Sequence, residues 1–297
     1  MKKFIQKILG LVLAISALTM VSCESARDDE DAEYSSMDEF YTKHRQEEQE
    51  FIIDSAGTGP IIGKQGTQIL VDTSIFMLPG GGDLTFPFTL KLIELYPESD
   101  FIEFPMSTVS NSTVTEAAGA IRVRAYKNNV ELVLKPGKVY GAAMTNANNL
   151  KNTMAIFYGE NKDTDVNWTP ATDQLSTVVI SGNTYAMAMS QMGWATCAKT
   201  HTGGATTIVT FKAKGSGTDK IDVFIIAKDY FSVVKVKSLQ SIQIPTGENV
   251  TVVAMAMDQN KKYRLHYSSE IITSGKTIDL DMKIVTEQEV LDKLAAL

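Results

Sequence analysis

Cys197 and His201 are the residues whose types and spacing first suggest catalysis. They lie four positions apart, so on one face of a helix the imidazole would lie next to the thiol and could deprotonate it. The residues around them are typical of a loop or a strand, however, and no third residue is spaced to orient the histidine. We therefore expect Cys197 to be a small buried side chain, as free cysteines usually are, beside an exposed His201.

The sequence shows no metal site and no cofactor motif. His44, His201 and His266 are scattered, and neither a Cys-x-x-Cys nor a His-x-x-x-His pair occurs. The glycine-rich segment at 79–83 lacks the Lys and the Ser or Thr of a phosphate-binding loop, so we expect it to connect two strands. No Gly-x-Ser-x-Gly elbow is present. We therefore expect no cofactor, no metal and no enzymatic activity.

Cys23 has the most specific context of any residue in the chain. Three lysines and an apolar run at 8–20 precede it, and Ser22 is its immediate neighbour. This is the pattern of a secretory signal peptide, and the apolar run is shorter than the about 20 residues that span a bilayer. A cysteine after a small residue at this point predicts cleavage after Ser22 and lipid attachment at Cys23. The alternative is an ordinary signal peptide with an incidental cysteine nearby.

The segment after Cys23 is strongly acidic. The chain has a net charge of −7, and residues 23–50 hold eleven Asp and Glu against three Lys and Arg. Residues 24–33 are expected to be extended and solvated. Ser36 and Glu39 then predict a capped short helix up to about Glu50. The rest of the chain is nearly neutral and has no basic patch, so nucleic acid is not an expected partner.

Asp28, Asp29, Glu30 and Asp31 follow the predicted lipidation site closely. This acidic run resembles the export signal of surface lipoproteins in Bacteroidetes-type bacteria. The resemblance implies an outer-membrane protein that lies on the cell surface, with the membrane as its partner through the lipid on Cys23 and other envelope proteins as possible partners. A plain acidic spacer, which would also be too flexible to bind calcium well, is the alternative.

From residue 60 onward the sequence has the pattern of strands. Short runs rich in β-branched and aromatic residues are separated by Gly, Pro and Asn turns. Arg122 and Arg124 alternate with apolar neighbours, as in a half-exposed strand. Asn128 and Asn129 fit a tight hairpin turn, because asparagine tolerates a positive φ. No helical periodicity interrupts these runs, which favours antiparallel sandwiches over a parallel sheet.

These patterns divide the chain into four parts. We assign residues 1–22 to the signal peptide and 23–59 to an acidic tether. Residues 60–172 and 173–297 form two antiparallel β-sandwich-like domains in this prediction. The fold class is therefore all-β, with a short helix near each end, and Thr286 with Glu289 predicts the cap of the C-terminal helix.

Several turn and strand motifs carry a further resemblance. They are Gly66-Thr67, Phe88 to Tyr96, Ala118 to Ala125 and Leu134 to Lys138. Together they resemble a β-sandwich module of Bacteroidetes lipoproteins that is distantly similar to the module shared by ankyrins and netrin receptors. The segment at 192–197 resembles a Gly-Trp-x-x-Cys signature that follows the module, although Ala198-Lys199 replaces the usual Asp-Arg. The resemblance implies a fold and says little about function.

Two classes of function fit these features. The preferred hypothesis is a non-enzymatic surface lipoprotein that presents a binding or structural surface; an envelope-assembly or motility factor is a variant that the sequence does not separate from it. The alternative is a glycan-capturing or hydrolytic partner of a surface nutrient-uptake system. That alternative needs exposed aromatic platforms, for which the candidates are Trp168, Trp194, Tyr41, Tyr230 and Tyr267.

Overall fold

Strands account for most of the regular structure. The computed structural model describes residues 34–297 except 57–58, 71, 83, 146, 148–149, 161, 163 and 215–219. Three short helices accompany the strands: α2 (Met37–His44), α3 (Glu98–Glu103) and α4 (Glu287–Ala295). The predicted all-β class, with a short helix near each end, is confirmed, and α3 is a helix that the sequence did not predict.

The largest sheet runs through both halves of the chain. Its strands are β1 (Gln49–Ile53), β5 (Phe88–Leu95), β6 (Val109–Ser110), β7 (Thr113–Ala117), β8 (Ala120–Lys127), β9 (Val130–Glu131), β12 (Ala155–Gly159), β13 (Trp168–Pro170), β16 (Gly193–Thr200), β17 (Thr206–Lys214), β20 (Gln240–Pro245) and β23 (Thr277–Asp281). The main path is β1-β5-β8-β16-β7-β20-β17-β23, with the other strands beside it.

Three smaller sheets complete the fold. The first, in the order β14-β15-β11-β3-β2, contains β14 (Thr177–Ser181), β15 (Thr184–Met189), β11 (Tyr140–Met144), β3 (Gln68–Leu70) and β2 (Ile61–Ile62). The second, in the order β19-β18-β21-β22-β24, contains β19 (Ser232–Val236), β18 (Asp222–Ala227), β21 (Asn249–Met257), β22 (Tyr263–Ile271) and β24 (Lys283–Val285). The third pairs β10 (Val133–Leu134) with β4 (Phe76–Met77).

Each five-stranded sheet packs its apolar face on part of the large sheet. Leu90, Leu92 and Val123 of the large sheet share one core with Ala142 and Met187 of the β14–β2 sheet. A second core joins β17, β20 and β23 to β18 and β21 and is built mainly from aliphatic side chains. We call the two layered regions the first and the second sandwich. Alternation along the strands explains them, because every second side chain points to the same face.

The chain does not change sandwich at the predicted boundary of 172 and 173. β15 pairs with β11, and β16 pairs with β8 and β12, so residues up to 200 contribute to the first sandwich. The expected antiparallel pairing holds for most neighbours, but β17 and β23 pair in parallel along Thr210–Lys214. Parallel neighbours need a long crossover connection, and the strands β18 to β22 supply it.

The folded part begins before residue 60, where we expected it to start. Helix α2 buries Phe40 and Tyr41, and the Tyr41 hydroxyl donates a hydrogen bond to Asp222 at 3.2 Å. Strand β1 pairs with β5 along its whole length. Ser36 caps α2 as predicted, but Glu39 accepts from the backbone N–H of Ser35 instead of Ser36. These elements are ordered by tertiary burial, which a polar local sequence does not reveal.

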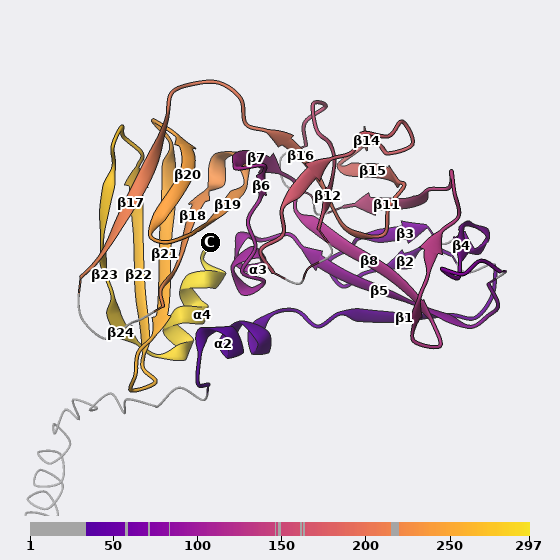
Figure 1. Ribbon diagram of the computed structural model, residues 1–297, viewed down its shortest axis with the longest axis horizontal. Helices are drawn as coiled ribbons and strands as arrows, with labels where there is room; N and C mark the ends of the chain where they lie inside the picture. The colour runs from indigo at the N-terminus through magenta and orange to yellow at the C-terminus, as the bar shows by residue number, and fades with distance from the viewer. Residues whose placement is uncertain are drawn as a thin grey trace, which may run out of the picture. The chain divides into compact units, whose positions relative to one another are not determined.

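The three helices lie between the two sandwiches (Figure 1). They share a core that includes Phe101, Trp168, Trp194 and Phe224. The capping box at Thr286 and Glu289 is confirmed, and α4 buries Val290 and Leu294. No helix in the described part of the chain has the length and apolar content needed to cross a membrane.

Candidate functional site

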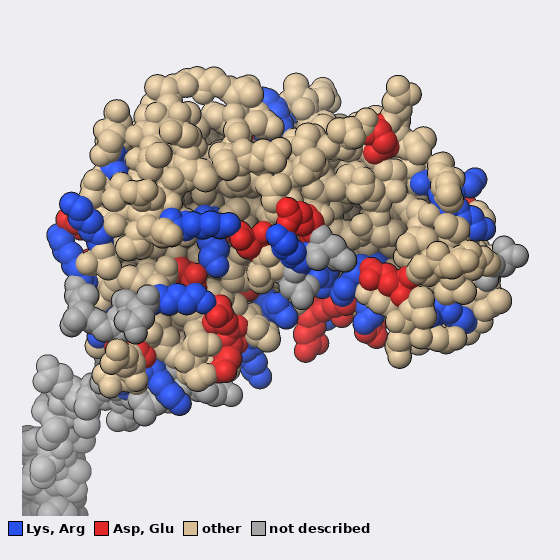
Figure 2. All heavy atoms as spheres, viewed as in Figure 1, with Lys and Arg blue, Asp and Glu red and all other residues tan. Residues whose placement is uncertain are grey.

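A pocket of about 360 Å³ opens where the linker between α2 and β1 crosses strands β5 and β8. Acidic and basic side chains gather along the lower middle of the molecular face in Figure 2, where β1, β5 and α3 lie in Figure 1. The pocket is lined by Thr42, Arg45, Gln46, Glu47, Glu48, Ile93, Phe104, Arg122 and Arg124. Three guanidinium groups therefore surround one small space.

Strand alternation places two of the arginines. Arg122 and Arg124 are two residues apart on β8, so they share the face opposite to Ile121 and Val123, which are buried in the first sandwich. The alternation seen in the sequence is confirmed, but the expectation of a half-exposed strand is wrong at Arg122, because the strand is buried on both faces there. Arg122 is only 6% exposed, because Trp194 is its neighbour across the sheet.

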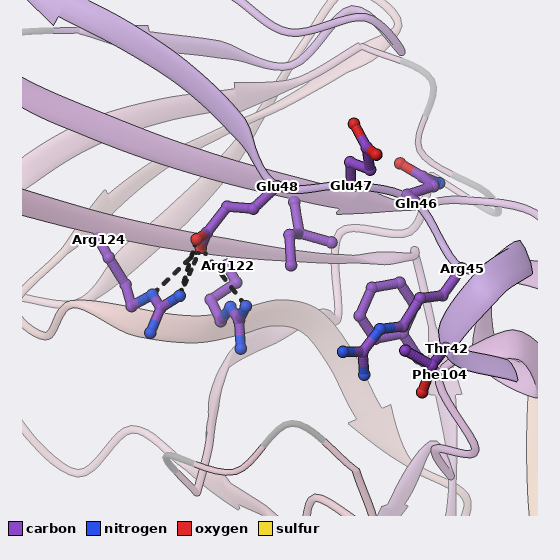
Figure 3. Close-up of a pocket in the computed structure, with 9 residues that line it drawn as sticks. Thr42, Arg45, Gln46, Glu47, Glu48, Phe104, Arg122 and Arg124 are labelled. Carbon is purple, nitrogen blue, oxygen red and sulfur yellow. Dashed lines mark hydrogen bonds and ion pairs between the residues drawn. The ribbon is translucent and has the colours of Figure 1, made fainter. Parts of the chain in front are cut away.

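The third arginine and the acidic partner come from the linker at 45–48. Two glutamines hold this linker: Gln46 donates to Asp100 at 2.8 Å and Gln49 donates to Glu94 at 2.8 Å. Figure 3 shows Gln46 and Glu47 pointing away from Arg122 and Arg124, whereas Arg45 and Glu48 point toward these two arginines.

The anchor beneath the linker is a buried carboxylate. Glu94 is fully buried and also accepts hydrogen bonds from the backbone N–H groups of Gln65 and Thr67 at 2.9 and 2.8 Å. Gly63 lies so close that a Cβ atom there would be 2.4 Å from the Glu94 carboxylate. The loop at 63–67 thus packs on Glu94. Because Glu94 also accepts a hydrogen bond from Gln49, it holds the linker in a fixed position.

Glu48 is shared between two of the arginines. Arg124 Nη2 donates to both of its carboxylate oxygens at 2.8 Å, and Arg122 Nη2 lies 3.4 Å from one of them (Figure 3). Burial disfavours the charged form of Arg124, but the hydrogen bond and the charge of Glu48 outweigh it, so the pKa of Arg124 is raised. The carboxylate therefore locks the two guanidinium groups in place.

Arg45 differs from the other two arginines. Its guanidinium lies 5.6 Å from the centre of the Phe104 ring, and within the described part of the chain it makes no hydrogen bond or ion pair. Arg122 similarly lies 5.1 Å from the centre of a Trp194 ring. In Figure 3 the guanidinium groups of Arg45 and Arg122 face the same space from opposite sides. Stacking on aromatic rings restricts both side chains.

The pocket is suited to binding a negatively charged group. Guanidinium groups stay protonated at all physiological pH values and form paired hydrogen bonds with carboxylate, sulfate or phosphate. They do not act as proton acceptors or nucleophiles at neutral pH. The chemistry offered by these three side chains is therefore electrostatic recognition.

A titratable carboxylate lies beside the pocket. Glu103 ends α3, directly before the pocket residue Phe104. Burial, together with the charge of Asp100, raises the pKa of Glu103 to about 7. A carboxylate at the C-terminal end of a helix is also opposed by the helix dipole. The charge of Glu103, one residue before Phe104, therefore changes within the neutral pH range.

The Cys197 and His201 pair does not form a catalytic site. Cys197 is fully buried, and burial raises the pKa of its thiol far above the usual range. Its nearest polar contact is the sulfur of Met187 at 3.2 Å. His201 instead contacts Glu116 and stacks on Tyr230. The expectation of a buried cysteine is confirmed, whereas His201 is half-buried and not exposed as we had expected.

Strand β22 carries a His-Ser-Glu row that the sequence analysis did not single out. His266 Nε2 lies 3.0 Å from Ser268 Oγ, which donates to Glu270 at 3.1 Å. The other ring nitrogen of His266 accepts from the backbone N–H of Asp281, so a neutral ring carries its proton on Nε2. Burial, moreover, lowers the pKa of His266. A proton on Nε2 prevents this histidine from deprotonating the serine, so the row is a structural hydrogen-bond chain.

The aromatic platforms required for glycan capture are not exposed. Trp168 and Trp194 are each 1% exposed, and Tyr41 and Tyr230 are also buried. Our expectation that these tyrosines are exposed was wrong, because both pack into the cores between and within the sandwiches. Tyr267 alone of the five candidates is half-buried. The glycan-capturing hypothesis thus loses its main support.

The remaining predicted site residues lie in other places. His44 contacts Glu287 of α4 at 2.8 Å, and within the described ranges no three metal-ligating side chains gather. Cys23 and the acidic run of Asp28, Asp29, Glu30 and Asp31 lie outside the residues that the structure describes.

Comparisons with known proteins give no relative for this chain. No family model matches it, and no curated protein and no solved structure is similar to it.

Proposed function

We propose that this protein is a lipid-anchored surface lipoprotein that binds an anionic ligand in the pocket of Arg45, Arg122 and Arg124. In this proposal it is not an enzyme. The lipid on Cys23 holds it on the outer membrane, and the acidic run at 28–31 directs it to the cell surface. Its partners are the membrane, other envelope proteins and a ligand that carries a carboxylate, sulfate or phosphate group.

Arg45 carries the proposal. A guanidinium group that is held over a ring and has N–H groups without a protein acceptor can bind an anion through charge-assisted hydrogen bonds. Glu48 serves Arg122 and Arg124, while Arg45 has a ring beneath it and no acceptor among the described residues. A bound anion between Arg45 and Arg122 would supply that acceptor.

Calorimetric titration of the full-length protein in detergent tests the pocket, with sodium sulfate, inorganic phosphate and D-glucuronate as probes. We expect one of these anions to bind and Arg45→Ala to weaken its binding by at least about tenfold, since a charge-assisted hydrogen bond contributes roughly 1.5–3 kcal/mol. Lys43→Ala is the matched control, because Lys43 is an exposed cation in the last turn of α2, two residues before Arg45. Equal loss in both variants, or no binding of any probe, would overturn the pocket assignment.

The anchor has a separate test. Cells expressing the protein should incorporate radiolabelled palmitate into it, and Cys23→Ala should abolish the labelling. Protease added to intact cells should digest the protein if it lies on the surface. Labelling that persists in Cys23→Ala would refute lipidation at this residue, and protection from protease would refute surface exposure.

A further inference from the structure

Among the described strands, none pairs with the outer side of β14. β14 pairs with β15 from Thr177 to Ser181 and is the first strand in the order β14-β15-β11-β3-β2. Figure 1 draws it at the rim of the sheet, with no strand beyond it. A strand in this position presents unpaired backbone N–H and C=O groups to any extended segment that can reach them.

Other strands at the ends of sheets carry features that discourage such pairing. Charged side chains occur in β1, β19, β23 and β24, and β2 is only two residues long. β14 has none of these protections, since its sequence is Thr-Val-Val-Ile-Ser. Charges and short edge strands are the usual means by which natural proteins prevent edge-to-edge association. Among these strands only β14 has neither a charged side chain nor a very short length. This indicates that its edge can pair with another strand.

The hairpin geometry defines which backbone groups are available. Ser181 and Thr184 pair across a two-residue turn that contains Gly182, whose φ is +60°. The pair that flanks such a turn exchanges both of its hydrogen bonds. Alternation then directs the backbone groups of Ser181, Val179 and Thr177 toward β15. Those of Val178 and Ile180 point away from the sheet.

We propose that β14 pairs antiparallel with β14 of a second copy of this chain, about a two-fold axis at Val179. Val178 of each copy then lies opposite Ile180 of the other, and Val179 lies opposite its own equivalent. The outward-pointing groups of Val178 and Ile180 form about four intermolecular hydrogen bonds in this register. The two five-stranded sheets become one continuous sheet.

The side chains favour a second copy over an unrelated peptide. Thr177 lies opposite Ser181 in this register, so a hydroxyl faces a hydroxyl, and the three central positions pair apolar with apolar. Cross-strand pairs of these kinds stabilise antiparallel sheets, and no like charges oppose one another. A two-fold axis presents the same patch from both copies, so a strand of symmetric chemistry fits itself. The surface over β14 to β16 is also mostly uncharged in Figure 2.

The predicted dimer is weak in solution, because pairing of five residues buries less than the about 1,200 Å² of a standard interface. Disulfide trapping is therefore the first test, on the full chain carrying Cys23→Ser, which leaves the buried Cys197 as its one other cysteine. In the proposed register the Val179 Cα atoms form a non-hydrogen-bonded pair about 4.5 Å apart, which a disulfide can bridge.

Val179→Cys should form the intermolecular disulfide at least about tenfold faster than Ile62→Cys at equal protein concentration. Ile62 is the matched control, because it is 61% exposed, against 62% for Val179, and lies on the strand at the opposite end of the same sheet. Equal rates for the two variants would overturn the proposal.

A substitution without cysteine chemistry provides the second test. Val179→Lys places two like charges on the two-fold axis and should abolish the dimer in sedimentation equilibrium, while Val179→Thr should retain it. The exposed position makes both substitutions compatible with folding, and circular dichroism checks this. The proposal fails if Val179→Lys and the unsubstituted chain have the same association constant or are both monomeric up to about millimolar concentration. Neither test depends on the ligand or the anchor.

Discussion

Two groups of charged side chains in this molecule each surround a single carboxylate. They differ in whether every basic side chain contacts that carboxylate. Glu116, which is 7% exposed, is contacted by Lys151 at 2.7 Å, by Lys199 at 3.7 Å and by His201 at 3.5 Å. We call this group the Glu116 cluster. In the arginine pocket Glu48 contacts Arg122 and Arg124, whereas Arg45 contacts neither Glu48 nor any other acceptor in the described chain.

The difference separates a structural cluster from a binding site. Both lysines of the Glu116 cluster contact its carboxylate directly, and they remain 38% exposed. Arg45 and Arg122 instead lie over aromatic rings on opposite sides of an open pocket. Arg45 has N–H donors without a described acceptor and is held in place beside an open pocket. This combination, more than charge alone, indicates a ligand-binding site.

The largest expected effect is that of removing the carboxylate from the pocket. Glu48→Ala removes the carboxylate that Arg124 contacts through both oxygens at 2.8 Å and that also contacts Arg122, whose side chain is 7% exposed, so we expect a loss of about 2–4 kcal/mol in the free energy of unfolding. Urea denaturation measures it. Glu47→Ala is the control, because Glu47 is exposed. Similar losses in both variants would mean that Glu48 does not hold the arginines in place.

Glu103 should produce a pH effect of the next size. Its folded pKa of about 7 lies above the ordinary glutamate pKa of 4.5, so the folded state binds more protons than the unfolded state in this interval. Stability is therefore lost as the pH rises from about 4.5 to 7. Glu103→Gln should remove this slope and stabilise the protein at pH 8 by about 1–3 kcal/mol. Denaturation at pH 5 and pH 8 gives the comparison, and an unchanged slope would contradict it.

The Glu116 cluster should respond to pH in the opposite sense. Burial raises the pKa of Glu116, but the hydrogen bond from Lys151 and the surrounding positive charges outweigh it and lower the pKa overall. The stabilisation is present at neutral pH and is lost as the pH falls through the folded pKa. Glu116→Gln should cost about 1 kcal/mol at pH 7 and less in acid. An equal cost at both pH values would show that the ion pairs are not responsible.

The smallest effect on stability is expected at Arg45. Arg45→Ala removes a half-exposed cation from the face of Phe104, a contact that contributes about 0.5–1 kcal/mol. The free energy of unfolding should therefore change by less than about 1 kcal/mol even though anion binding is lost. Thermal denaturation with and without the bound probe separates these two results. A loss of stability as large as that of Glu48→Ala would identify Arg45 as a structural residue.

Local sequence was sufficient wherever neighbouring residues decide the conformation. The Asn128-Asn129 turn adopts φ angles of +50° and +63°, as an asparagine pair permits. The Thr286 capping box and the alternation of Arg122 and Arg124 are likewise set within a few residues. The all-β class follows from many such strand patterns, each one weak by itself.

Tertiary structure decided the rest. Helix α2 is largely polar in sequence and strand β1 is only five residues long, yet both become part of the fold because Phe40 and Ile53 pack against apolar side chains from distant segments. The parallel pair of β17 and β23 depends on a crossover that no local pattern encodes. The pocket likewise brings Arg45 of the linker close to Arg122 of β8. The hydrogen bonds of Gln46 and Gln49 to carboxylates fix the position of the linker. The sequence by itself thus determined the strands and the proposed lipid attachment at Cys23. Long-range packing determined which charged side chains form the pocket.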